Sequence, residues 1–478
     1  MFKLNRDILY LIFEELQDDK NTLYSCLSVN KTWSEIIVPI LWKDPWKYSK
    51  WGNDKLLLNI IISHLSDKSK NGLKDQGIDF LTNSYQKPLF NYIRFCRRLN
   101  LIAIDRIIDT IIYIYSKSKI LIIKNEIYNL FINENTKFTH LYMPNKFDHQ
   151  IHLISGAKHC FADIEFFSCN TSINDNVLTG LLEICNSIKE LELFIEVTDN
   201  NYEIVKLIKA QKKLSKIHFL TNYSISPKSD ESFCIILENS LIKHANTIRY
   251  FKITKPPITS MLSSFVNLIT LELDDDYGNF RDITWLENLS LPFLQILRAS
   301  RVQIKALTSL IGNTNGSLIE IKIDYVSHDE INNKKLIQVI YQNCPNLEYL
   351  KLVFRNSNIL ELENLLIKCQ HLNELFFIIS DLLTFNWETL FIILTKSSPI
   401  SLFKFEFDFF ELPKLNSLKL FFDNWKGRHP MLLQFCRINK ELSDLIEIYK
   451  SEGIVKQYNN DYSLENCENY DNYEENCW

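Results

Sequence analysis

The chain has 478 residues, of which 46% are hydrophobic and 23% charged, and its formal net charge is −5. These values indicate a folded chain, long enough for several small domains or one elongated repeat domain. They argue against a general electrostatic attraction to nucleic acid or to an anionic membrane. The 10 glycines form no G-x-G-x-x-G, G-x-x-x-x-G-K or G-x-S-x-G pattern, which argues against Rossmann, P-loop and serine-hydrolase folds.

The apolar segments and the cysteines indicate the compartment. The N-terminal apolar stretch contains Arg6 and Asp7 and lacks a small-residue cleavage site, unlike a signal peptide. The most apolar segment, 99–123, is interrupted by charged residues that would be costly in a bilayer. The 11 cysteines form no C-x-x-C pair, which favours reduced thiols. We therefore expect a cytoplasmic or nuclear protein without a membrane span.

The first fifty residues predict three short helices. Apolar residues recur at helical spacing from Leu4 to Leu16, with Asn5 placed to cap the first turn. Two further apolar patterns follow, over 23–29 and over 33–42. Three short helices cannot bury all of these large side chains on one another, so we expect a partner to cover the surplus.

The same residues carry a resemblance to a known family. The run from Leu4 to Leu9, the apolar positions that follow it, and the ending from Val38 to Trp46 resemble an F-box, in the version found in large fungal F-box families. One position departs from the pattern, because Asn5 replaces the proline that usually follows the first leucine. Asparagine lacks the rigid apolar ring, so we expect a somewhat reduced affinity for the partner.

The resemblance implies that residues 1–46 dock to a Skp-type adaptor and, through it, to a cullin-RING ubiquitin ligase. The alternative is a helical cap that packs against the rest of this chain. The residues implied to bind the adaptor are Leu4, Asn5, Ile8, Leu9, Ile12, Phe13, Leu16, Leu23, Leu27, Val29 and Trp33.

Residues 47–137 are expected to be linker helices and an N-terminal cap for the region that begins at residue 138. The pattern predicts a capped helix over 53–65, a polar loop over 66–77, and a strand and helices over 88–134.

From residue 138 onward the chain shows an internal repeat. An apolar triplet spaced as L-x-x-L-x-L recurs, with a mean period of about 26 residues, within the leucine-rich-repeat range. Its first positions are Phe138, Phe161, Ile188, Leu214, Ile248, Leu268, Leu294, Leu318, Leu347, Leu372 and Ile400. In two of these triplets the second and third members are Ile164 and Phe166, and Phe403 and Phe405.

Each repeat predicts a short strand followed by a helix, because the last two apolar residues of a triplet point to one strand face and helical patterns lie between triplets. Cys185, Cys344 and Cys369 each precede a triplet, which resembles the cysteine-containing leucine-rich repeats that often accompany F-boxes. We therefore predict an α/β fold: a leucine-rich-repeat solenoid over 138–410, with parallel strands on its concave face and helices on its convex face. Residues 411–456 are expected to form a C-terminal cap, and 457–478 an acidic, Asn- and Tyr-rich disordered tail.

One column of strand residues is a candidate target-binding surface. The residue between the second and third apolar positions of the last nine triplets is basic in five cases, and parallel strands would stack these side chains into a ladder. Such a ladder favours an acidic or phosphorylated protein segment, and the alternative is a merely solvated stripe. In the neighbouring column, Ile296 and Leu402 are further possible anchors. The predicted target-binding residues are Tyr250, Lys252, Arg298, Lys322, Tyr349, Lys351 and Lys404.

No residue set indicates catalysis or a bound metal. His149, His152, His159 and Cys160 include an i,i+3 histidine pair, but no second matching pair accompanies it, so no metal and no cofactor are expected. We expect a non-enzymatic substrate-recognition subunit of an SCF-type (Skp-cullin-F-box) ubiquitin ligase. The alternatives are a leucine-rich-repeat scaffold that binds a protein without ubiquitin transfer, and an enzyme with an unfamiliar site.

Overall fold

The structure is a computed structural model and describes residues 5–47, 53–78, 88–221, 230–275, 280, 284–324, 329–379, 385–409 and 411–459. The chain forms two compact units. Unit 1 comprises residues 1–222 and 226–244, and unit 2 comprises residues 223–225 and 245–478. The predicted α/β class is confirmed, because in each unit parallel strands alternate with helices.

Unit 1 begins with five helices: α1 (Arg6–Glu15), α2 (Lys20–Leu27), α3 (Lys31–Leu41), α4 (Asp54–Ser63) and α5 (Asp67–Asp75). Local capping explains where α2 and α3 start. The Asp19 carboxylate accepts a hydrogen bond from the Thr22 backbone N–H at 3.1 Å, and the Asn30 side chain accepts one from Trp33 at 3.0 Å. Each bond satisfies a backbone donor that has no partner within the helix.

Two local predictions in this region are wrong. Asn5 precedes α1 with an extended backbone, but its side chain makes no capping hydrogen bond. Residues 66–77 are not a loop, because α5 occupies most of them. The Ser66 hydroxyl caps this helix by accepting from the Ser69 N–H at 3.1 Å, and Leu73 anchors it with 1% of its surface exposed. The polar composition of this segment predicted a loop, but the cap and the one buried leucine stabilise a helix.

The parallel strands of unit 1 follow one another in chain order. They are β1 (Arg98–Asn100), β2 (His140–Tyr142), β3 (Phe166–Asn170), β4 (Glu190–Ile195) and β5 (Lys216–Thr221). The accompanying helical segments are η1 (Ile93–Phe95), α6 (Leu101–Asp109), α7 (Lys117–Phe131), η2 (Ile151–Leu153), α8 (Ala157–Phe161), α9 (Asp175–Leu182), α10 (Glu203–Ala210) and α11 (Glu231–Ile242).

Unit 2 repeats the same alternation, and its strands are also parallel and in chain order. They are β6 (Tyr250–Ile253), β7 (Thr270–Asp274), β8 (Ile296–Ser300), β9 (Glu320–Asp324), β10 (Tyr349–Phe354), β11 (Glu374–Ile379), β12 (Lys404–Phe409), β13 (Met431–Phe435) and β14 (Val455–Asn459). The helices are α12 (Met261–Ser264), α13 (Thr284–Glu287), α14 (Ile304–Gly312), α15 (Glu330–Asn343), η3 (Asn356–Asn358), α16 (Ile359–Lys368), α17 (Trp387–Ser397), α18 (Leu415–Trp425) and α19 (Lys440–Ser451).

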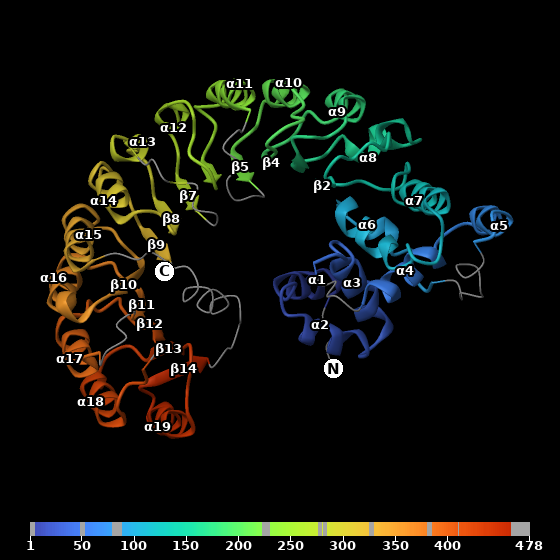
Figure 1. Ribbon diagram of the computed structural model, residues 1–478. Helices are drawn as coiled ribbons and strands as arrows, with labels where there is room; N and C mark the ends of the chain where they lie inside the picture. Colours follow the sequence, from blue (N-terminus) through green and yellow to red (C-terminus); the bar gives the residue numbers. More distant parts are fainter. Residues whose placement is uncertain are drawn as a thin grey trace. The chain divides into compact units, whose positions relative to one another are not determined.

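Within each unit the core lies between the strands and the helices that connect them. In unit 1 the middle apolar positions Leu141, Phe167, Leu191 and Ile217 are aligned in register, and each is at most 1% exposed. In Figure 1 the helices α9 to α11 lie along one face of the unit 1 strands, and α14 to α18 lie along one face of the unit 2 strands, so the side chains on that face are buried. We call the opposite side of the strands the helix-free face. It is the face that the sequence predicted to be concave.

The register corrects two of the predicted triplets. Leu141 pairs with Phe167 and not with Ile164, so the second repeat reads Ile164, Phe167 and Cys169. Leu375 pairs with Phe405, so the last predicted repeat reads Leu402, Phe405 and Phe407. Burial agrees, because Leu402 is 1% exposed whereas Ile400 is 91% exposed.

The parallel strands also extend beyond the predicted repeat region of 138–410. Strand β1 pairs with β2 on the N-terminal side, and β13 and β14 continue the order after β12. The predicted caps therefore contain strands of the same sheet. Strand β14 crosses the predicted boundary at 457, and residues 460–478 of the predicted tail lie outside the described residues.

The three cysteines that precede triplets behave as small core residues. Cys185, Cys344 and Cys369 are at most 1% exposed, and burial raises the pKa of each thiol to about 12. These thiols therefore stay protonated and unreactive. In the described part of the chain, no helix combines the length and the apolar character needed to cross a bilayer.

Candidate protein-binding surfaces

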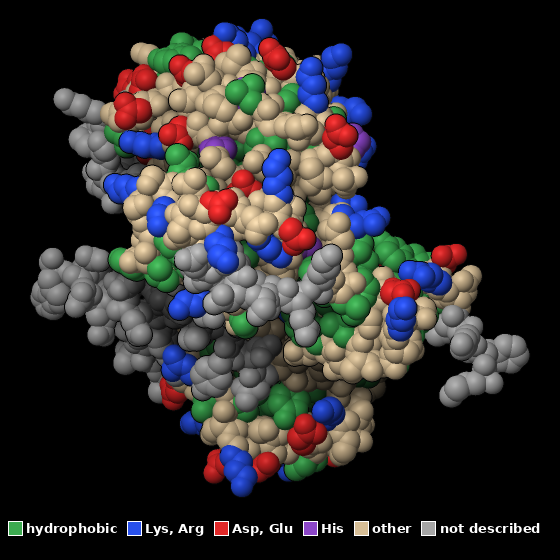
Figure 2. All heavy atoms as spheres, turned by 90° about the vertical axis from the view of Figure 1, so that its right-hand side faces the viewer, with side chains coloured by type: hydrophobic (Ala, Val, Ile, Leu, Met, Phe, Trp, Pro, Cys, Tyr) green, Lys and Arg blue, Asp and Glu red, His purple; other side chains and the backbone are tan. Residues whose placement is uncertain are grey.

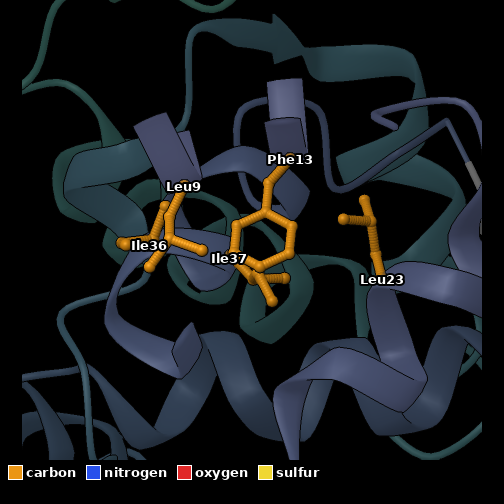
Figure 3. Close-up of a cluster of buried hydrophobic side chains, with 5 residues drawn as sticks. All are labelled: Leu9, Phe13, Leu23, Ile36 and Ile37. Carbon is orange, nitrogen blue, oxygen red and sulfur yellow. The ribbon is translucent and has the colours of Figure 1, made fainter. Parts of the chain in front are cut away.

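The first three helices form a small module with its own core. Figure 3 shows Leu9 and Phe13 of α1, Leu23 of α2, and Ile36 and Ile37 of α3 pointing toward one another. The Phe13 ring also meets the Trp33 ring edge to face, with centroids 5.1 Å apart. These side chains hold the helices together, since each fully buried aliphatic or aromatic side chain contributes roughly 1.5 to 3 kcal/mol.

This packing divides the residues predicted to bind an adaptor. Leu9, Phe13 and Leu23 are 6%, 2% and 0% exposed, so in the chain alone they form the core of the module, and their contact with a partner stays a prediction. Leu16, Leu27 and Trp33 are partly buried against that core. Ile8, Ile12 and Val29 are exposed, and so is Asn5. Leu4 lies outside the described residues.

Exposed apolar residues gather on one side of α1. Ile8, Leu11 and Ile12 are 47%, 62% and 42% exposed, and their spacing of three and four residues places them on one helix face. We call these three residues the α1 ridge. Leu11 is absent from the predicted set, because the unbroken apolar run over 8–13 does not show which of its residues face inward.

The other end of the module is fixed to the rest of unit 1. The Trp46 indole N–H donates to the Arg98 carbonyl at 2.6 Å, and the Arg97 N–H donates to the Lys43 carbonyl at 3.0 Å. The Trp42 ring stacks on Tyr92 with centroids 4.6 Å apart. The segment 38–46, which is part of the F-box resemblance, therefore attaches the module to the residues of β1 and to those beside η1. The α1 ridge stays exposed.

An apolar groove of about 320 Å³ lies beside the module. Its walls come from α2, α3 and α4, and include Tyr24, Leu41, Trp42, Leu56 and Ile60. Tyr24 and Leu56 are 53% and 63% exposed. Apolar surface is thus available on more than one face of the helical segment.

The helix-free face of unit 2 carries the predicted basic ladder, with one correction. Lys252 pairs in register with Glu272, Glu272 with Arg298, and Arg298 with Lys322, as the repeat predicts. Lys351 continues this column. Lys404 does not, because it pairs with Glu374, and Glu406 takes the expected place beside Phe376. The cause is the two-residue shift of the last triplet, which also buries Leu402 in the core.

The basic side chains of this face are neutralised by neighbouring carboxylates. The Arg298 guanidinium contacts Glu272 at 2.7 Å and Glu320 at 2.8 Å, and these carboxylates raise the pKa of the guanidinium above its ordinary value. Lys404 contacts Glu374 at 2.6 Å and Glu406 at 3.0 Å. Glu272 and Glu406 lie in the same column as the cations, whereas Glu320 and Glu374 lie in the neighbouring column.

Counting all charged strand residues of this face reverses the predicted balance. The five basic residues of the ladder face seven acidic ones on the same strands: Glu272, Asp274, Glu320, Asp324, Glu374, Glu406 and Asp408. Figure 2 shows a different side of the molecule, on which Lys and Arg side chains are interspersed with Asp and Glu. The predicted preference for an acidic or phosphorylated segment stays a prediction, and this arrangement gives it little support.

Lys351 is buried and makes contacts within the chain. It is 5% exposed, and its Nζ lies 2.6 Å from Asp324 Oδ1 and 4.0 Å from the centroid of the Phe376 ring. Tyr349 is half-buried, and burial raises the pKa of its hydroxyl. Tyr250, Lys252 and Lys322 are partly exposed, so these residues remain accessible members of the predicted set.

The histidines considered as metal ligands do not form a site. The Cys160 thiol is buried and donates to the Asn133 carbonyl at 2.8 Å, and His149 packs edge-on against Tyr128. Among the residues that the structure describes, no group of three or more potential ligands comes together.

Neither the protein-family models nor the curated proteins include a match to this chain. Its function is therefore inferred from the sequence and from the geometry of the two units.

Proposed function

We propose that this chain is a non-catalytic substrate-recognition subunit of an SCF-type ubiquitin ligase, in which the helical module acts as an F-box and the strand repeats bind a protein target. The observation that carries the proposal is the exposed α1 ridge on a module that already has a complete core of its own. An apolar helix face in that position is suited to packing against the helices of another protein.

The energetics support docking through this ridge. Moving a half-exposed leucine or isoleucine to full burial contributes on the order of 1 kcal/mol, so the three ridge residues and their neighbours supply several kcal/mol. Tyr10 is 44% exposed beside them. This gain has to exceed the loss of rotational and translational freedom on association, while a rigid module adds little further ordering cost.

The attachment of the module supports a tethering role. The contacts of Trp42 and Trp46 with η1, β1 and α7 are intramolecular and well packed. A module held in this way fixes its adaptor-binding helices relative to the first strands. Presenting a target at a fixed distance from a bound ubiquitin carrier raises the effective concentration of its lysines.

A second candidate is a protein-binding scaffold that takes part in no ubiquitin transfer. The departure at Asn5 favours it, because this residue lacks the proline ring of the family pattern and makes no capping hydrogen bond. The two candidates differ in whether a cullin-dependent loss of the target is observed.

Adaptor co-purification tests the proposal. We expect the Leu11→Asp variant to lose co-purification with a Skp-type adaptor, because a carboxylate would be buried without a partner at the interface. The matched control is Leu360→Asp on α16, since Leu360 is a leucine on a helix surface with 68% exposure, against 62% for Leu11. Equal adaptor recovery for both variants would argue against docking through the ridge.

A further inference from the structure

The helix-free face of unit 1 carries an aromatic cluster that the predicted repeat frame did not show. His140 and Phe166 are register partners on β2 and β3, and their rings stack with centroids 5.3 Å apart. Tyr142 lies two residues beyond His140, and its ring centroid is 4.9 Å from that of Phe166. All three side chains are partly exposed, so together they form an aromatic surface on the strands.

Two carboxylates are tied to the strand positions that flank Tyr142. Ser168 is the register partner of Tyr142, and its hydroxyl donates to Glu192 Oε1 at 2.7 Å. Glu196 accepts from the Asn145 side chain at 3.3 Å and from Asn170 at 2.5 Å. Glu192 therefore lies beside Tyr142, and Glu196 lies further along the strands, bonded to Asn145 three residues after Tyr142 and to Asn170 four residues after Phe166.

These carboxylates differ from those of unit 2 in lacking a cation. In the described ranges, no lysine or arginine forms an ion pair with Glu192 or Glu196, and their hydrogen-bond donors are neutral. The neighbouring charges are already paired, Glu190 with Lys216 and Arg98 with Asp44, and the His218 ring lies within hydrogen-bond distance of Glu190. Burial, followed by the charge of Arg98, lowers the pKa of His140 to about 4, so this ring adds no positive charge near neutral pH.

A side chain that complements this surface must carry positive charge and a flat or polarisable head. Aromatic ring faces attract cations, and arginine also stacks on them through its planar guanidinium. Carboxylates fixed at the rim of the rings then accept hydrogen bonds from the same group. A phosphorylated or acidic segment would instead meet two unneutralised negative charges.

We propose that Tyr142, Phe166, Glu192 and Glu196 form a docking site for an arginine- or lysine-bearing segment of a partner protein. This inference deepens the proposed function, on which it rests, because it names the chemical class of the target. It concerns unit 1, outside the residues 250–404 in which the sequence placed target binding.

Titration with a defined peptide tests the site in the full-length chain. The probe is a short synthetic peptide of alternating arginine and glycine, followed by fluorescence anisotropy at low and at physiological salt. Its citrulline counterpart removes the charge and keeps the shape, and a glutamate–glycine peptide reverses the charge. We expect the arginine peptide to bind most tightly.

Variants locate the binding on this face. Tyr142→Ala is expected to weaken the arginine peptide roughly three- to tenfold, whereas Tyr142→Phe keeps the ring and the affinity. The double variant Glu192→Gln with Glu196→Gln should weaken it similarly and flatten its salt dependence. The matched controls are Glu183→Gln, an exposed carboxylate at the end of α9, and Tyr113→Ala, a tyrosine of unit 1 with 98% exposure. Neither control should change the affinity.

Several results would overturn the inference: no binding of the arginine peptide, equal binding of the citrulline or glutamate peptide, or an equal loss for Glu183→Gln. Because no adaptor is present in this assay, its failure would leave adaptor docking standing. Conversely, a lost adaptor interaction in Leu11→Asp would leave the peptide result unchanged.

Discussion

Units 1 and 2 share the alternation of parallel strand and helix but differ in how they treat charge on the helix-free face. In unit 2 the ladder cations are matched by carboxylates of adjacent strands, as with Arg298 between Glu272 and Glu320. In unit 1, Glu192 and Glu196 are held by neutral donors beside an aromatic cluster. The same repeat geometry can therefore use charge for cohesion in one unit and leave charge available for a partner in the other.

The largest effect on stability is expected at Lys351. Lys351→Met should lower the free energy of unfolding by about 3 kcal/mol, because it removes the lysine ammonium that pairs with the buried Asp324 carboxylate. Urea denaturation followed by circular dichroism measures this. The control is Lys404→Met. The Lys404 side chain is 34% exposed, so this variant should lower the free energy of unfolding clearly less. Equal losses of stability in the two variants would mean that the greater burial of Lys351 does not make its ion pair more important than that of Lys404.

His140 should make unit 1 sensitive to acid. Its folded-state pKa of about 4 lies below the ordinary value of 6.5, so the unfolded chain binds more protons between these values and stability falls as the pH drops below 6.5. Allowing for its partial exposure, we expect about 1 kcal/mol less stability at pH 5 than at pH 7 from this residue. His140→Gln should remove that part of the pH dependence in urea titrations at the two pH values. An unchanged dependence would show that His140 is not the group responsible.

Removing one ladder carboxylate should have a smaller effect. Glu320→Gln weakens one of the two charged partners of Arg298, whose side chain is 42% exposed, so we expect a loss of at most about 1 kcal/mol. The loss should shrink at high salt, because screening acts on a partly exposed pair. A loss of stability that does not change with salt would indicate that lost packing, and not lost charge, destabilises this variant.

The smallest effect is expected for Glu192→Gln. Since Glu192 has no cationic partner among the described residues, its neutralisation should change the free energy of unfolding by less than about 0.5 kcal/mol. The same substitution should still weaken the arginine peptide. A loss of stability as large as that of Glu320→Gln would show that Glu192 serves cohesion, and the difference between the units would disappear.

The sequence predicted the repeat well because buried apolar positions recur with a strand period and a helix period. It failed where two frames fit the same spacing. Ile400, Phe403 and Phe405 match the triplet as well as Leu402, Phe405 and Phe407 do, and the strand register and the burial against the helices distinguish the two frames. That shift moved Lys404 into the wrong column.

The candidate sites were harder to predict because they depend on neighbours far apart in the chain. The pattern of α1 does not show that Leu9 and Phe13 face α3 while Ile8 and Leu11 face outward. The aromatic cluster of His140, Tyr142 and Phe166 was hidden by the wrong frame of the second repeat. In both places the helix or strand itself was predicted, and the packing partner decided which side chains are exposed.

The proposed function depends most on binding of a Skp-type adaptor by the α1 ridge. Isothermal titration of the full-length chain with purified adaptor measures this binding. We expect one adaptor per chain, with an affinity that the paired substitution Ile8→Asp and Ile12→Asp lowers by about a hundredfold or more, equivalent to a loss of about 3 kcal/mol. An absence of binding by the unaltered chain, or the same affinity for the variant, would contradict adaptor docking through the ridge.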